Sequence, residues 1–326
     1  MQMKKNGVIE VIVARDGSGD FTTVQAAIDS IKDSSKETVI QIKKGTYKEK
    51  IHIWKPNVTL IGEDANETIL TYDDYARKLF DDGTKYGTFH SYTVLVAGNN
   101  FKASNITFQN TAGRGSEVGQ ALAAYVDADK VSFENCRFLG SQDTLFTGPL
   151  PPTPMAGGLF GSPMEDAPKV PGRQYYKNCY IEGDVDFIFG TAIAVFENCE
   201  IFSFERDREV NGYVTAASTQ EGQDYGYVFI DCRLTSDAKP GTVYLGRPWR
   251  NFAKTVYINC EMGAHIKTEG WHNWNKPEAE DTILYAEYGS KGEGANDSMR
   301  APYVKFFKDS DLKDYTLDKI FKDWRP

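Results

Sequence analysis

Two aspartates stand out because each lies inside an apolar, aromatic stretch of the chain. Asp143 lies in Gly140-Ser-Gln-Asp-Thr-Leu-Phe146, and Asp186 lies in Gly183-Asp-Val-Asp-Phe-Ile-Phe-Gly190. A buried carboxylate is costly unless it is paired or used in chemistry. One such aspartate is more often a turn cap or the partner of an arginine, but two in similar settings favour a functional site. The pair suggests a reaction in which one carboxyl group is an acid or base and the other a nucleophile.

Four further side chains have types that suit the same chemistry. Gln142 precedes the first aspartate and Gln120 lies upstream, and a glutamine amide can donate to a developing oxyanion. Arg247 and Trp249 belong to an Arg-Pro-Trp sequence that we place at a strand end, because proline lacks a ladder donor. A guanidinium can hold a carboxylate ionised, and an indole can stack on a sugar ring. Taken alone, each of the four is also compatible with a structural role.

Other reaction classes are disfavoured by what the sequence lacks. The four histidines lie near no nucleophile motif, no Gly-x-Ser-x-Gly is present, and the five cysteines do not have metal-ligand spacing. We therefore expect no metal and no cofactor. The formal net charge of −9 argues against nucleic acid and anionic lipid as partners. No apolar run approaches the roughly 20 residues of a membrane helix.

The cysteines also mark a repeat that must position these residues. Each follows a short strand-like run ending in Asn or Asp and precedes another such run, and successive cysteines are 20 to 43 residues apart. The members are Cys136, Cys179, Cys199, Cys232 and Cys260. A strand-turn-strand unit that recurs at this distance is typical of a solenoid. The sequence predicts an all-β fold, a single-stranded right-handed parallel β-helix with asparagine ladders at its bends.

Few segments depart from the strand pattern. Residues 22–31 have apolar residues at helical spacing after a threonine, which predicts a short helix capping the N-terminal end. The C-terminal tail, residues 301–326, is expected to hold one more short helix between 309 and 322. Residues 148–172 are rich in proline and glycine and predict a long inserted loop without helix or strand. We interpret residues 1–326 as one domain.

Several motifs resemble those of the pectin methylesterases, a family of carbohydrate esterases also called pectinesterases. They occur in the family's order, at residues 16–28, 108–113, 140–146, 186–190, 244–249, 270–271 and 285–288. The resemblance implies a right-handed parallel β-helix. It also implies hydrolysis of the methyl esters of galacturonate in pectin or in methylated oligogalacturonides, with release of methanol.

The resemblance assigns a role to each candidate catalytic residue. Asp186 would be the nucleophile, Asp143 the general acid and base, and Arg247 the group that orients the nucleophile. Gln120 and Gln142 would stabilise the oxyanion. Because neighbouring acids with different roles need separate pKa values, we expect Arg247 to lower the pKa of Asp186 and aromatic surroundings to raise that of Asp143.

The resemblance extends to substrate contacts and to a disulfide. Trp249 and Thr88 would contact the sugar, together with Gln120 and Arg247. Family members often join the cysteines matching Cys179 and Cys199, a bridge that would stay open in a reducing cytoplasm. The chain departs from the family at Gly190-Thr191, at 215–219 and in its longer loop 148–172, which concerns substrate preference more than the reaction.

Two alternatives remain at this point. A polygalacturonase or lyase on the same scaffold would also use paired carboxylates, although a lyase needs an acidic calcium site. A β-helix that only binds pectin is the second alternative. The N-terminus shows no signal-peptide core, so we expect a cytoplasmic monomer, or a secreted one if a signal was removed. The acidic chain and the loop beside Asp143 further suggest imported methylated oligomers as substrates.

Overall fold

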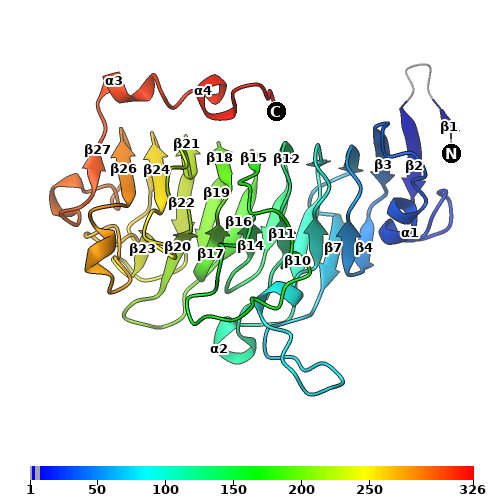
Figure 1. Cartoon of the computed structure of the whole chain (residues 1–326), viewed down its shortest axis with the longest axis horizontal. Helices are drawn as coiled ribbons and strands as arrows, with labels where there is room; N and C mark the ends of the chain where they lie inside the picture. The colour runs from blue at the N-terminus through cyan, green and yellow to red at the C-terminus, as the bar shows by residue number, and fades with distance from the viewer. Residues whose placement is uncertain (1, 4–7) are drawn as a thin grey trace.

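The chain folds as a parallel β-helix, and the predicted all-β architecture is confirmed. The computed structural model describes residues 2–3 and 8–326. Three sheets run along the molecule, and consecutive strands of the chain pass from one sheet to the next, so that every turn of the chain stacks on the previous one. Figure 1 shows this stack extending from the N-terminal helix to the last strand.

The longest sheet has twelve strands, and all its neighbours pair in parallel except the first two. Its strands are, in spatial order, β1 (Gln2–Met3), β2 (Ile9–Val13), β3 (Thr38–Ile42), β6 (Val58–Gly62), β9 (Lys102–Ser104), β12 (Val131–Glu134), β15 (Arg173–Lys177), β18 (Ile193–Glu197), β21 (Tyr227–Ile230), β24 (Lys254–Ile258), β26 (Leu284–Tyr288) and β27 (Lys305–Phe306).

The two other sheets complete each coil. The eight-stranded sheet contains β4 (Gly45–Lys48), β7 (Thr68–Tyr72), β10 (Thr107–Asn110), β13 (Arg137–Leu139), β16 (Tyr180–Gly183), β19 (Glu200–Ser203), β22 (Arg233–Ser236) and β25 (Glu261–Met262). The seven-stranded sheet contains β5 (Ile51–Ile53), β8 (Val94–Val96), β11 (Ala124–Val126), β14 (Leu145–Thr147), β17 (Val185–Gly190), β20 (Gly212–Ala217) and β23 (Val243–Gly246).

The repeated Asn-Cys or Asp-Cys pair forms the bend between the twelve-stranded and eight-stranded sheets. The residue before each cysteine has a φ of 53° or 52°, in the left-handed region that Asn and Asp tolerate better than other side chains. Adjacent bends are linked where Asn198 Nδ2 donates to Asn178 Oδ1 at 2.7 Å, which confirms an asparagine ladder. All five cysteines are buried inside the coil.

Aromatic rings form a continuous stack in the interior. Paired positions of five neighbouring strands place Phe133, Tyr176, Phe196, Phe229 and Tyr257 above one another, with ring centroids 4.5 to 5.2 Å apart. Interplanar angles of 7° to 12° show that the rings are nearly parallel. Because each ring is fixed by its strand register, the stack holds the coils in a defined alignment.

Helices cover the ends and one face of the solenoid. The predicted N-terminal helix is confirmed as α1 (Val24–Asp29), capped where Thr23 accepts from the amide of Ala26. The tail differs from the prediction, because it forms two short helices, α3 (Asp309–Leu312) and α4 (Leu317–Phe321). Lys313 follows the first helix, and Thr316 caps the second, where its side chain accepts from the amide of Lys319. The tail runs back over the twelve-stranded sheet (Figure 1), where Phe321 packs on Tyr175.

The remaining helical turns are brief. They are η1 (Thr88–His90), α2 (Gly115–Val118), η2 (Pro277–Ala279) and η3 (Asp297–Met299). Residues 148–172 contain neither helix nor strand, as predicted from their composition. Among the described residues no helix is long and apolar enough to cross a membrane.

Candidate active site

Backbone geometry brings the two aspartates to one cleft. Asp143 lies in the turn before β14, Asp186 lies in β17, and the amide of Asp143 donates to the carbonyl oxygen of Val185 at 3.1 Å. Their φ angles are 61° and 52°, which few residues other than glycine adopt. The register of β17 against β20 shifts between Val185 and Ile188, and such a bulge redirects a side chain. Both carboxyl groups therefore line the same cleft, of about 490 Å³.

Burial raises the pKa of both carboxyl groups, but not equally. The pKa of Asp143 lies well above its ordinary value, because burial disfavours the charge and the nearby Asp186 carboxylate repels it. Burial also raises the pKa of Asp186, while its ion pair with Arg247 opposes the rise. The expectation of a lowered pKa for Asp186 was wrong, because burial outweighs the arginine. The order is nevertheless the expected one, with Asp186 the first to ionise.

Arg247 grips Asp186 with two hydrogen bonds. Its Nε donates to Oδ1 at 2.8 Å, and its Nη2 donates to Oδ2 at 2.6 Å. The guanidinium lies between two aromatic rings, with its Cζ 3.8 Å from the ring centroid of Tyr213 and 3.7 Å from that of Trp274. A desolvated cation between ring faces is held both electrostatically and sterically. The plane of the guanidinium, and with it the carboxylate of Asp186, is thereby fixed.

Gln120 and Gln142 line the same cleft as the aspartates. Within the described part of the chain, neither side-chain amide has a hydrogen-bond partner, so both can donate to a ligand. Gly115 of α2 lies against Gln142, and a Cβ there would come within 2.6 Å of the Gln142 Cβ. This glycine therefore leaves the space that Gln142 occupies.

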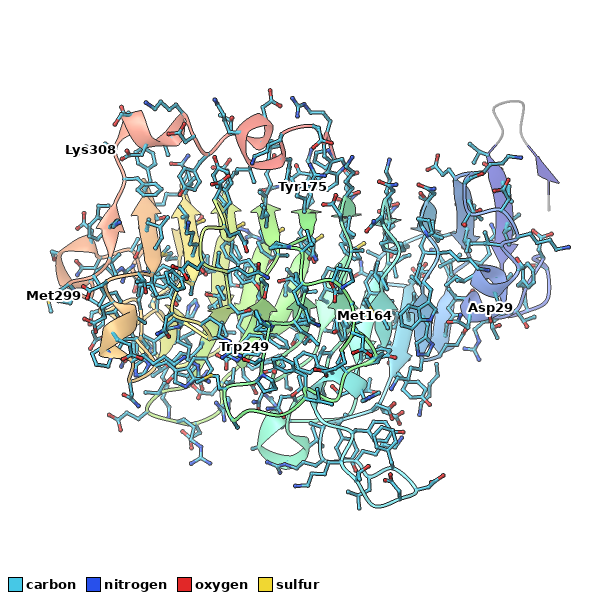
Figure 2. The ribbon with its side chains drawn as sticks, viewed as in Figure 1. Asp29, Met164, Tyr175, Trp249, Met299 and Lys308 are labelled. Carbon is cyan, nitrogen blue, oxygen red and sulfur yellow. The ribbon has the colours of Figure 1, made fainter. Side chains whose placement is uncertain are left out.

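Thr88 and Trp249 also line the cleft. Thr88 begins η1, and Trp249 follows β23. Figure 2 shows Trp249 toward the edge of the coils opposite Tyr175 and the C-terminal tail. All seven residues predicted for catalysis or sugar contact thus line one cleft, although Thr88 and Gln120 are far from Arg247 in sequence.

Sequence reasoning missed several residues of this site. The cleft is also lined by Trp274, Phe160, Leu159 and Phe189. The ring of Tyr213 stacks on the guanidinium of Arg247. Trp274 follows the Gly-Trp motif at 270–271, Phe189 lies in the motif at 186–190, and Leu159 and Phe160 lie in the loop 148–172, so these had an available signal. Tyr213 carried no signal, because nothing in its local sequence indicates which side chain it faces.

Both predicted disulfide partners are free thiols in the structure. Cys179 and Cys199 occupy equivalent positions on adjacent coils, and their sulfurs donate to the carbonyl oxygens of Phe133 and Tyr176. The bridge implied by the family resemblance is therefore not formed here. In residues 2–3 and 8–326, no group of three or more His, Cys, Asp or Glu side chains is placed to hold a metal ion.

Comparison with known proteins agrees with the fold. The sequence profile of the Pectinesterase family matches residues 10–149 and 169–323. Pectinesterase 31 of Arabidopsis thaliana is 38% identical over 311 residues, which cover 92% of this chain and 88% of that protein. Pectinesterase 2 of Olea europaea is 39% identical over 306 residues, covering 91% and 74%.

Solved structures give the same result. The pectin methylesterase from carrot superimposes with a TM-score of 0.81 at 33% identity, covering 95% of this chain and 92% of that one. A mutant pectin methylesterase in complex with a hexasaccharide gives 0.79 at 29% identity, covering 97% of both chains.

The parallel β-helix fold and the similarity to these relatives identify the chain as a carboxylic ester hydrolase. The chain belongs to the pectinesterase family. Its reaction is the hydrolysis of the methyl esters of pectin.

Proposed function

We propose that this cleft hydrolyses the methyl ester of a galacturonate residue with Asp186 as nucleophile and Asp143 as general acid and base. One observation carries the assignment. Asp186 is held by two nitrogens of Arg247, whereas Asp143 has a raised pKa and, among the described residues, no cation bonded to it. The two carboxyl groups are therefore fitted to different protonation states in the same cleft.

In the first half of the reaction, a carboxylate oxygen of Asp186 attacks the ester carbonyl carbon. The carbonyl oxygen becomes an oxyanion, and the free amide groups of Gln120 and Gln142 donate to it. As the tetrahedral intermediate collapses, the bond to the methoxy oxygen breaks and protonated Asp143 gives that oxygen its proton. Methanol leaves, and the galacturonate carbonyl remains joined to Asp186 as an anhydride.

In the second half, Asp143 is a carboxylate and acts as the base. It takes a proton from a water molecule, whose oxygen attacks the same carbonyl carbon. Collapse of the second intermediate releases the galacturonate carboxyl group and returns Asp186 as a carboxylate beside Arg247. Asp143 again carries a proton, so the enzyme returns to its starting state.

Trp249 and Thr88 are the proposed sugar contacts, because both line the cleft. A tryptophan face stacks on the apolar face of a sugar ring, which suits the neutral, methylated form of the polymer. The hexasaccharide complex of a related pectin methylesterase supports an oligosaccharide ligand for this cleft. The monomeric state and the cytoplasmic location stay predictions.

The test is the variant Asp186→Asn, assayed for methanol release from methylated pectin. We expect a loss of at least about 10³-fold, as for removal of a covalent nucleophile, with the fold retained as measured by circular dichroism. Asp129→Asn is the matched control, because Asp129 is also bonded by an arginine, Arg173, outside the catalytic cleft. Methanol release retained by Asp186→Asn overturns the assignment. New reducing ends or unsaturated products from the wild type would instead indicate a glycosidase or a lyase.

A further inference from the structure

Residues 150–168, which we name the inserted segment, lie between the two parts of the chain that match the Pectinesterase profile. The Pectinesterase profile ends its first match at residue 149 and resumes at residue 169. The segment begins just after β14, the strand that follows Asp143, and ends just before β15. A long segment without helix or strand beside a catalytic group is often functional.

The inserted segment contributes side chains to the lining of the catalytic cleft. The ring of Phe160 meets Phe89 at 5.5 Å and an interplanar angle of 87°. It meets Trp249 at 6.2 Å and 80°. Phe89 belongs to η1, and Trp249 follows β23, so the two lie on coils far apart in the chain. Phe160 therefore packs against both an early and a late part of the cleft lining, and Leu159 and Pro154 line the cleft beside it.

Contacts along its length hold the inserted segment in place. Arg250 donates through Nη2 to the carbonyl oxygen of Thr153. The hydroxyl groups of Tyr125 and Ser162 lie 2.9 Å apart. Lys169 Nζ donates to the carbonyl oxygen of Glu165 at 2.6 Å. The first two contacts attach the segment to the coils at Thr153 and Ser162, and the third closes a local turn at its end.

The opposite side of the inserted segment faces a second hollow, of about 900 Å³. Met164, Ala167 and Pro168 line this hollow, together with Val170 just beyond the segment. Figure 2 shows Met164 apart from Trp249 along the coils. The segment thus contributes to two separate hollows, to the catalytic cleft through Leu159 and Phe160 and to the second hollow through Met164, Ala167 and Pro168.

We propose that the inserted segment blocks passage of a polysaccharide through the catalytic cleft and restricts the enzyme to methyl esters near the ends of short oligogalacturonides. The inference rests on the proposed function of the cleft. A polymer needs a groove that is open at both ends, whereas a cleft closed by Phe160 admits a sugar chain only by its end. Short chains have more ends for each ester group, so they are the better substrates.

The experiment compares methanol release from fully methylated hexagalacturonate and from highly methylated polymeric pectin at equal ester concentration. For the wild type we expect kcat/KM to be at least about tenfold higher on the hexamer. In the double variant Leu159→Ala/Phe160→Ala we expect kcat/KM on the polymer to rise. The ratio of kcat/KM on the hexamer to that on the polymer should then fall at least about threefold. Val170→Ala is the control, because Val170 is similarly exposed, 72% against 79% for Leu159, but lines the other hollow.

Leu159→Ala alone covers the case in which the double variant folds poorly, because an exposed leucine contributes little to the core. We expect it to move the ratio in the same direction by a smaller factor. Equal wild-type rates on hexamer and polymer overturn the inference, as does a ratio unchanged in both variants. Absence of methanol from both substrates contradicts the proposed function instead, so the two failures are distinguishable.

Discussion

Two carboxylate–guanidinium pairs of this protein have the same chemistry in different surroundings. In the first, Glu287 accepts from Arg300 Nε at 2.8 Å and Nη2 at 3.0 Å, and also from the indole of Trp271 at 3.0 Å. The other guanidinium hydrogens go to three carbonyl oxygens, those of Lys267, Thr268 and Gly294. Glutamate and arginine side chains are 6% and 1% exposed. This pair is saturated, and it joins the last coils to one another.

The second pair, Asp186–Arg247, lies at a cleft, and its hydrogen-bonding capacity is not fully used. Its side chains are 10% and 16% exposed, and rings instead of carbonyl oxygens cover the guanidinium. Next to it, Asp143 is buried with no bonded cation among the described residues. The difference teaches that a saturated buried pair stabilises the fold, whereas a pair with unused capacity beside a second acid is available for reaction.

The largest effect that tests this contrast is expected for Asp143→Asn. The variant cannot give a proton to the methoxy group or take one from water, so kcat should fall about 10²- to 10⁴-fold. The fold should persist, because the amide has the shape of the carboxyl group. Steady-state methanol release and thermal melting measure both quantities. A kcat within threefold of the wild type would contradict the assigned role.

The saturated pair should respond in the opposite way. Glu287→Gln leaves the charge of Arg300 buried and uncompensated, which should lower the free energy of unfolding by about 3 kcal/mol or more. The kcat of the folded enzyme should stay unchanged, because Glu287 does not line the cleft. Urea unfolding and active-site-normalised rates test this. Lost turnover with normal stability would show that the two pairs do not differ as described.

The coil architecture was predictable because each of several coils contains the same short sequence pattern. Asn or Asp followed by Cys recurs in five successive coils, and the Asn or Asp tolerates the left-handed bend while the cysteine fills the interior. The catalytic candidates were predictable as residue types for the same local reason. A carboxylate inside an aromatic run needs an explanation, and Arg-Pro-Trp cannot lie within a strand.

The rest of the site depends on contacts between distant coils. The bulge at Asp186 arises from the register of β17 against β20, which no short window of sequence reveals. Tyr213 and Trp274 meet on Arg247 from different coils. The pKa of Asp186 was assigned the wrong direction because the depth of burial, which outweighs the ion pair, is a property of the folded chain.

A smaller effect is expected when the clamp around Arg247 is loosened. Trp274→Ala removes one ring face, and a desolvated cation–π contact of about 2 kcal/mol corresponds to a loss of kcat of more than about tenfold. Because a less ordered Arg247 stabilises the Asp186 carboxylate less, the acid limb of the pH–rate profile should move to higher pH. Trp274→Phe should restore most of both. A change in KM alone, with kcat and pH profile intact, would make Trp274 only a sugar contact.

The smallest expected effect concerns stability and pH at Asp143. Its pKa is raised in the folded protein, so the folded state binds this proton more tightly than the unfolded chain does. The contribution of Asp143 to the free energy of unfolding is therefore fully present below the ordinary pKa of aspartate. It is lost as the pH rises from that value through the raised pKa of the folded protein. Asp143→Asn lacks this titration, so its stability relative to the wild type should increase over that pH range. Urea unfolding at a series of pH values measures the difference, and a difference independent of pH would mean that the charge on Asp143 costs the fold nothing.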